Sequence, residues 1–124
     1  MTSRKKILLI DDDEAVLDAM QARLGRAFEV VTTKASDAAL GLALEEKPDL
    51  ILCDVDMPGV DGGDISAALF NDDRLRHIPL LFLTALLDPD KLDAMNGQIG
   101  GRPAVSKRAP AAVLLARIWA LIEG

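Results

Sequence analysis

Five side chains in this sequence have the types and the spacing that metal-assisted phosphoryl chemistry uses. Asp11 and Asp12 follow one short apolar run, Asp54 ends a second, Thr84 ends a third, and Lys107 comes after a fourth. Carboxylates gathered together repel one another unless a cation lies between them or one of them binds a proton. A hard divalent cation such as Mg²⁺ takes oxygen ligands of this kind, and a hydroxyl and an ammonium can hold the remaining oxygens of a phosphoryl group. A carboxylate can also accept that group as a nucleophile.

The elements that would bring these residues together alternate between short apolar strands and helices. Strands are expected over residues 7–10, 28–32, 49–54, 78–84 and 103–106. Helices are expected over the stretch with the stripe Val16, Met20 and Leu24, and over residues 37–46, 64–70, 88–95 and 110–123. Continuous branched runs such as 7–10 are typical of strands that are buried on both faces of a parallel sheet. Five strands alternating with five helices therefore predict one α/β domain, a doubly wound parallel sheet with helices on both faces.

The order of the elements predicts where the five side chains meet. Sheets of this kind bind ligands outside the carboxyl ends of their strands, where the strand order reverses. Asp11, Asp12, Asp54, Thr84 and Lys107 all follow or end predicted strands, so each is expected at that one edge. The edge then offers several carboxylates, one hydroxyl and one ammonium to a ligand.

The helix expected over residues 37–46 has its own local signals. Ser36 precedes it and is expected to cap its first turn, and Pro48 ends it. Leu40 and Leu44 are four residues apart, which predicts that they share one face of this helix.

Three other polar residues have ordinary structural interpretations. Asp13 is expected to cap a helix or to be solvated. His77, the only histidine, is interpreted as a surface loop residue rather than as a phosphodonor or a ligand. Cys53 is interpreted as a small core residue, because it lies within an apolar run.

Composition and length exclude several classes of protein. The chain has 124 residues and a formal net charge of −6, which argues against binding to a nucleic-acid backbone. The single cysteine excludes an internal disulfide and fits a reducing compartment. The apolar run at residues 7–10 is too short for a signal peptide or a membrane helix. We therefore expect a cytoplasmic protein with no nucleic-acid or membrane partner.

Taken in order, these motifs resemble the receiver domain of bacterial two-component response regulators, of the chemotaxis type. The matching stretches are residues 6–13, residues 48–62 with the Met-Pro-Gly-Val-Asp-Gly loop, and residues 78–85, followed by Lys107 at the expected distance. The combination is specific, although each motif alone is weak. The resemblance implies a single receiver domain over residues 1–124, with the flavodoxin-like strand order 2-1-3-4-5.

The resemblance also implies a role for each site residue. Asp54 would accept a phosphoryl group from a phosphohistidine on a sensor histidine kinase or a phosphotransfer protein. Thr84 would hydrogen-bond that group, and Lys107 would pair with it. The implied ligands of Mg²⁺ are the side chains of Asp11, Asp12 and Asp54 and the backbone carbonyl of Asp56. Such a domain is a signalling phosphoacceptor that catalyses only its own phosphorylation and dephosphorylation, and it is not a turnover enzyme.

The sequence departs from the family pattern at three positions. Arg108 follows Lys107 where receivers usually have a proline joined by a cis peptide, so we predict a trans or strained bond that would move the lysine head. Ala104 replaces an aromatic residue whose rotation couples to Thr84, and alanine has no rotamer to switch. Leu86 stands where polar residues are common, and its aliphatic side chain predicts slow self-dephosphorylation.

The helix expected over residues 110–123 carries little charge. Its face together with the helix at 88–95 is expected to bind a downstream protein or a second copy of the chain, as in receivers. Trp119 is the predicted exposed anchor, because tryptophan is enriched at interface hot spots. The alternative is a wide core contact surrounded by exposed alanines.

Two other functions are compatible with the sequence. A degenerate receiver would bind partners without phosphorylation, in keeping with Ala104 and Arg108. A small phosphatase of the haloacid-dehalogenase type shares a strand-end aspartate nucleophile, and Asp54-Val55-Asp56 matches its acid-x-acid motif. The Met57-Pro58 pair that follows, and the lack of chain length for a cap, argue against the phosphatase.

Overall fold

The chain forms the predicted alternation of strands and helices, and the computed structural model describes residues 4–34, 38–55, 62–99 and 101–124. The strands are β1 (Lys6–Ile10), β2 (Glu29–Thr33), β3 (Leu50–Asp54), β4 (Leu80–Thr84), β5 (Gln98–Ile99) and β6 (Arg102–Ser106). The helices are α1 (Glu14–Leu24), α2 (Ala39–Glu46), α3 (Gly62–Phe70), α4 (Pro89–Ala94) and α5 (Ala111–Glu123). Ser36, the predicted cap of α2, lies outside the described residues.

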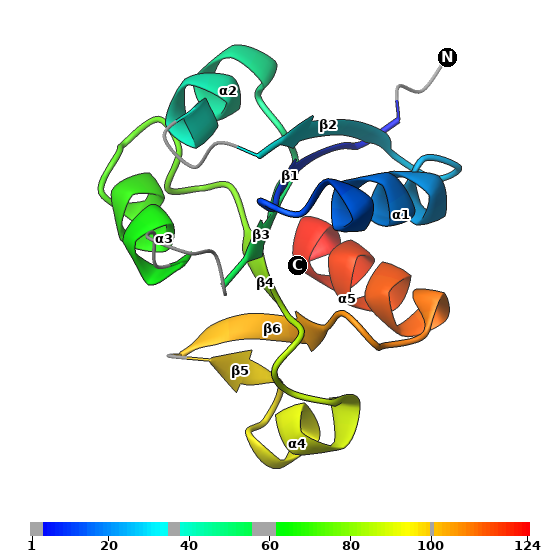
Figure 1. Ribbon diagram of the computed structural model, residues 1–124. Helices are drawn as coiled ribbons and strands as arrows, with labels where there is room; N and C mark the ends of the chain where they lie inside the picture. The colour runs from blue at the N-terminus through cyan, green and yellow to red at the C-terminus, as the bar shows by residue number, and fades with distance from the viewer. Residues whose placement is uncertain (1–3, 35–37, 56–61, 100) are drawn as a thin grey trace.

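The strands form one sheet in the order β2-β1-β3-β4-β6-β5 (Figure 1). The first five of these are parallel to their neighbours, and β6 is the predicted fifth strand, so the predicted order of the parallel strands is confirmed. The chain passes from β1 outward to β2 and then back across to β3. The strand order therefore reverses between β1 and β3. Asp11 lies at the carboxyl end of β1, and Asp54 lies at the carboxyl end of β3.

The prediction of five strands is wrong by one, because β5 forms an additional antiparallel edge. Its two residues pair with β6 in the register Gln98↔Pro103 and Ile99↔Arg102. Two residues are too few to give a periodic hydrophobic signal. The turns on either side use Gly97 (φ 67°) and Gly101 (φ 80°), in the left-handed region that glycine adopts at little cost.

Helices cover both faces of the sheet and create two hydrophobic cores. In β1, Ile7 and Leu9 point into the core shared with α1 and α5, while Leu8 and Ile10 point into the core shared with α2 and α3. Figure 1 shows α1 beside α5 on one side of the sheet, α2 and α3 on the other, and α4 next to β6. Burial on both faces explains why the central strands read as unbroken apolar runs. No helix in the described ranges is long and apolar enough to cross a membrane.

Helix α2 packs on the sheet through small side chains. Ala39 and Ala43 are buried, whereas Leu40 is 36% exposed and Leu44 packs at the margin of the core. Of the two leucines predicted to share one face of this helix, only Leu44 packs against the core. The helix is rotated so that its alanines occupy the contact, which lets the helix lie close to the sheet.

Helix α5 corrects the prediction of an exposed tryptophan. Trp119 packs against the core formed with α1, and its ring centroid lies 5.0 Å from that of Phe28 at an interplanar angle of 38°. An aromatic ring of this size gains more by covering another ring than by facing water. The exposed apolar side chains of α5 are Val113 and several alanines, as in the alternative of a wide core contact.

Candidate functional site

Two buried carboxylates occupy the edge where the strand order reverses. Asp11 follows β1 with no exposed surface, and Asp54 ends β3 with 2% exposure. Because Ile10 pairs with Cys53 in the parallel ladder, the two acids come next to each other in register. One carboxylate oxygen from each of Asp11, Asp12 and Asp54 lies within 4.8 Å of the others, with Asp12 exposed to solvent. The predicted carboxylate cluster is thus assembled.

The turn between β1 and α1 is organised by its own acids. The backbone N–H of Asp13 donates to Asp11 Oδ1 at 2.9 Å, and the Asp13 side chain accepts from the N–H of Ala15 at 2.9 Å. Asp13 is the N-cap of α1, as predicted. These bonds hold the turn so that Asp11 and Asp12 face Asp54 rather than cap the helix themselves.

Lys107 supplies the ammonium of the site. Its Nζ lies 2.8 Å from Asp11 Oδ2 and 3.3 Å from Asp54 Oδ1. Burial by itself lowers the pKa of this lysine, but the hydrogen bond and charge of Asp11 and the charge of Asp54 outweigh it and raise the pKa. The lysine is thereby held in its charged form between the two carboxylates.

The lysine reaches the site although no proline follows it. The peptide bond between Lys107 and Arg108 is trans. The Lys107 N–H donates to the Thr84 carbonyl at 2.8 Å, and the Arg108 N–H donates to Ser106 Oγ at 3.1 Å. The predicted trans bond is confirmed, and the expected displacement of the lysine head is not observed. The hydroxyl of Ser106, which sequence reasoning did not single out, fixes this turn from a buried position beside Thr84 in the ladder.

Thr84 is buried at the end of β4, the strand next to the one that Asp54 ends. Its hydroxyl oxygen accepts from the N–H of Leu86 at 3.1 Å, which fixes the first turn of the loop. The Leu86 side chain is 75% exposed, so its backbone rather than its side chain contacts Thr84, and slow self-dephosphorylation stays a prediction. Ala104 is buried and pairs with Phe82, so the position of the usual switch residue is filled by core packing.

The donor set fits a hard divalent cation. Three carboxylates lie together at this edge, and the two that pair with the Lys107 ammonium are almost fully buried. Mg²⁺ is held by one or two carboxylates and keeps coordination positions for water and phosphate, which suits an exposed Asp12 beside buried partners. Asp56, whose carbonyl the resemblance assigns as a further ligand, lies outside the described residues.

Cys53 lies beside the carboxylate edge, in an environment that disfavours an unpaired negative charge. Its side chain is fully buried, and its Sγ lies 3.4 Å from the Asp54 carbonyl oxygen. Burial, followed by the charges of Asp54 and Asp11, raises the pKa of the thiol to about 12. The interpretation of Cys53 as an unreactive core residue agrees with this environment.

Comparison with known proteins assigns the chain to a family. The family model of the response regulator receiver domain matches residues 7–119. Response regulator PleD of Caulobacter vibrioides is 36% identical over 118 residues, which are 94% of this chain and 26% of PleD. Transcriptional regulatory protein AfsQ1 of Streptomyces coelicolor is 37% identical over 94% of this chain and 51% of its own length. The chain therefore spans between a quarter and about half the length of these two relatives.

Solved structures show the same architecture. A putative response regulator from Chloroflexus aurantiacus has a TM-score of 0.82 at 25% identity and covers 98% of this chain and all of its own. Chemotaxis protein CheY4 of Vibrio cholerae has a TM-score of 0.79 at 25% identity, over 96% of this chain and 99% of its own. The BeF₃-activated receiver domain of Klebsiella pneumoniae RstA is 32% identical, with a TM-score of 0.76 over 97% of this chain and all of its own. These comparisons support the receiver interpretation over the phosphatase alternative.

Proposed function

The chain belongs to the family of response regulator receiver domains, and from this premise we propose that Asp54 is its phosphoacceptor. The general function of the family is transfer of a phosphoryl group to an aspartate in two-component signalling. The observation that carries the assignment to Asp54 is its environment. Asp54 ends a central strand, is buried, lies with Asp11 and Asp12 in one carboxylate cluster, and pairs with Lys107 at 3.3 Å.

The proposed step is a direct transfer from a phosphohistidine. A carboxylate oxygen of Asp54 attacks phosphorus, a P–O bond forms, and the P–N bond breaks with its electron pair remaining on the histidine nitrogen. Lys107, which already pairs with Asp54 and Asp11, is positioned to pair with a phosphoryl oxygen. Thr84 would donate its hydroxyl hydrogen to another oxygen, from its fixed position at the end of β4.

We assign Asp11, Asp12 and Asp54 as side-chain ligands of Mg²⁺, with the backbone carbonyl of Asp56 as a further ligand. When bound, the cation offsets the negative charge that develops on the transferred group. The carboxylate of Asp12 is exposed, so the proposed cation site is open to solvent and to an incoming phosphodonor. The carboxylates of Asp11 and Asp54 are buried and form the inner part of the site.

The partners follow from this chemistry. The donor is a sensor histidine kinase or a phosphotransfer protein, and the domain acts as a phosphoacceptor rather than a turnover enzyme. The signal leaves through a surface of the domain to a downstream protein or to a second copy, by way of the α4 and α5 face. Trp119 is half-buried against Phe28, so the exposed Val113 replaces it as the apolar contact on α5.

The test uses acetyl phosphate as a small phosphodonor, with mass spectrometry of the intact protein. We expect an adduct in the presence of Mg²⁺, loss of the adduct in Asp54→Asn and after chelation, and no change in the matched control Asp90→Asn. Asp90 is an exposed acid on α4, remote from the cluster in sequence. An adduct that persists in Asp54→Asn would overturn the assignment. Absence of any adduct in the natural sequence would favour a degenerate receiver that acts without phosphorylation. The buried Ala104, at the position of the usual switch residue, is the observation that supports this alternative.

A further inference from the structure

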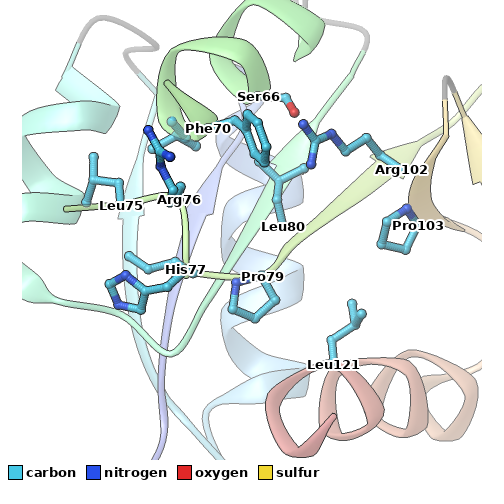
Figure 2. A pocket seen from close by; sticks show the side chains of 12 residues that line it. Ser66, Phe70, Leu75, Arg76, His77, Pro79, Leu80, Arg102, Pro103 and Leu121 are labelled. Atoms are coloured by element: carbon cyan, nitrogen blue, oxygen red, sulfur yellow. The ribbon is translucent and has the colours of Figure 1, made fainter. Parts of the chain in front are cut away.

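A pocket lies at the opposite end of the sheet from the carboxylates, beside the amino ends of β4 and β6 (Figure 2). Its volume is about 230 Å³. The apolar lining comes from four separate parts of the chain, and includes Leu69, Leu75, Pro79, Leu80, Pro103 and Leu121. We call this hollow the arginine pocket, because Arg76 and Arg102 also line it.

Two guanidinium groups converge on one aromatic ring in the arginine pocket. The Arg102 guanidinium carbon lies 5.1 Å from the centroid of the Phe70 ring, and that of Arg76 lies 6.0 Å from it. Figure 2 shows Phe70 between the two arginines. The ring itself is 53% exposed. Like charges brought to one ring repel each other, so the arrangement favours an anion between or beside them.

The donors of this pocket exceed its acceptors. Arg76 pairs with the exposed carboxylate of Asp73. The Arg102 guanidinium contacts the Phe70 ring but forms no hydrogen bond or ion pair with any described residue. The imidazole of His77 likewise has no hydrogen-bond partner within the part of the chain that the structure describes. Guanidinium and imidazole donors in a hollow are satisfied by carboxylate or phosphate oxygens.

A second pocket of about 450 Å³ adjoins the first and shares the wall formed by Leu75, His77 and Ile78. Its remaining lining combines α2 and the turn after it with Arg74, and includes Lys47. Arg74 pairs with Asp72, whereas Lys47 forms no ion pair with a described residue. Two partly apolar pockets, each lined by cations, therefore lie on either side of the segment between α3 and β4.

This layout fits an extended segment better than a compact ligand. The arginine pocket is smaller than the roughly 300–1,000 Å³ of common small-molecule sites, and it suits a single side chain. Two guanidinium groups meet at Phe70, but the further cations Arg74 and Lys47 line the second pocket, so the positive charge extends over both pockets instead of surrounding one point. Aromatic residues and arginine are enriched in the cores of protein interfaces.

We propose that this edge of the sheet binds an acidic segment of a partner protein, whose apolar side chains enter the two pockets while its carboxylates pair with Arg102 and Lys47. The partner is defined by charge complementarity with Arg102 and Lys47, which pair with no carboxylate of the described residues. The chain as a whole carries a net charge of −6, which disfavours a nucleic acid, because such a partner needs an extended basic face. The site lies at the edge opposite Asp54 and does not depend on phosphorylation.

The test titrates ¹⁵N-labelled protein with a synthetic peptide, acetyl-Glu-Leu-Glu-Glu-Leu-Glu-amide, at low salt. We expect saturable chemical-shift changes at Phe70, Leu75 and Ile78, and none at Asp54. Arg102→Gln is expected to weaken binding about fivefold, because it removes the donor that lacks a partner in the free protein. The matched control Arg26→Gln removes an exposed arginine outside both pockets and is expected to weaken binding less than about twofold.

Three outcomes would overturn the proposal. Equal weakening by Arg102→Gln and Arg26→Gln would mean general charge attraction, and equal binding of the peptide with glutamine in place of glutamate would mean that charge has no role. Tighter binding of an oligothymidylate than of the peptide would identify a nucleic-acid site instead. Phe70→Ala provides a second variant that removes an exposed ring; weaker peptide binding at an unchanged melting temperature would support the proposal, and unchanged binding would count against it.

Discussion

The two ends of the sheet hold charges in opposite ways. At the carboxyl ends of β1 and β3, buried carboxylates surround one ammonium at fixed distances of 2.8 and 3.3 Å. At the amino ends of β4 and β6, guanidinium groups surround an exposed aromatic ring. Buried charges interact strongly and depend on their partners, whereas exposed charges are screened by water and salt. The difference agrees with the roles proposed for the two edges, which are chemistry in a fixed geometry at the first and reversible contact at the second.

The largest expected effect concerns the reactivity of Cys53, which borders the carboxylate edge. With its pKa raised from 9.0 to about 12, the thiolate fraction in the native protein near pH 8 is lower than in the unfolded chain by roughly a thousandfold. We expect no labelling by a thiol reagent until the protein unfolds. Because the unfolded thiol loses its proton first, this residue's contribution to stability is complete below pH 9 and declines between pH 9 and about 12.

Labelling kinetics in native buffer and in urea measure this protection. The native protein with a cysteine-specific reagent is compared with the unfolded protein at the same pH. Rapid labelling in native buffer would mean that the edge opens locally, and would weaken the contrast between its two buried acids and the exposed arginines.

Replacing the ammonium of the buried cluster is expected to have the next largest effect. Lys107→Met leaves Asp11 and Asp54 facing each other without their cation and should reduce the free energy of unfolding by about 2 kcal/mol. Lys91→Met, which changes an exposed lysine on α4, is the matched control and should have little effect. Urea denaturation measures both. Equal midpoints for the two variants would mean that the buried pairs contribute nothing.

Removing one carboxylate should act in the opposite direction. Asp12→Asn lowers the repulsion within the cluster and should stabilise the protein in the absence of divalent cations by about 1 kcal/mol. The same variant should lose most of the stabilisation that added Mg²⁺ gives to the natural sequence, since binding to the native state alone raises stability. Asp18→Asn, an exposed acid on α1, is the control. A Mg²⁺-dependent shift in melting temperature that is identical in both variants would exclude Asp12 as a ligand.

The smallest effect on stability is expected at the opposite edge. Arg102→Gln removes a stacking contact on a half-exposed ring and should change the free energy of unfolding by about 0.5 kcal/mol or less. Urea denaturation beside Lys107→Met tests the comparison directly. A loss as large as that of Lys107→Met would show that the guanidinium supports the fold, and the contrast between the two edges would fail.

The carboxylate edge could be predicted from the sequence because topology fixes it. Strand-end residues in a parallel sheet meet at one edge whatever the side-chain details, so Asp11, Asp54 and Thr84 needed only the correct strand assignments. The position of Lys107 was harder, because the residue after it is arginine. The turn geometry that Ser106 provides through its hydroxyl was not visible in the residue types.

The arginine pocket could not be predicted, because it joins residues from loops and helix ends. Phe70, Arg76 and Arg102 have no common period in the sequence, and they meet only because the end of α3 and the segment after it lie beside the start of β6. The prediction that Trp119 is an exposed anchor is also wrong, and the reason again lies in tertiary packing. Periodicity places Trp119 off the main stripe of α5, but Phe28, directly before β2, extends the core to meet it.

The short strand β5 has a consequence for the behaviour of the protein at high concentration. A parallel sheet that ended at β6 would leave a row of unpaired backbone donors and acceptors open to another molecule, as in the growth of fibrils. Gln98 and Ile99 occupy that row with an antiparallel strand of two residues, and Pro103 opposite Gln98 removes one donor. The hairpin thereby limits β-sheet polymerisation at this side of the molecule, and contact with other proteins is left to side chains.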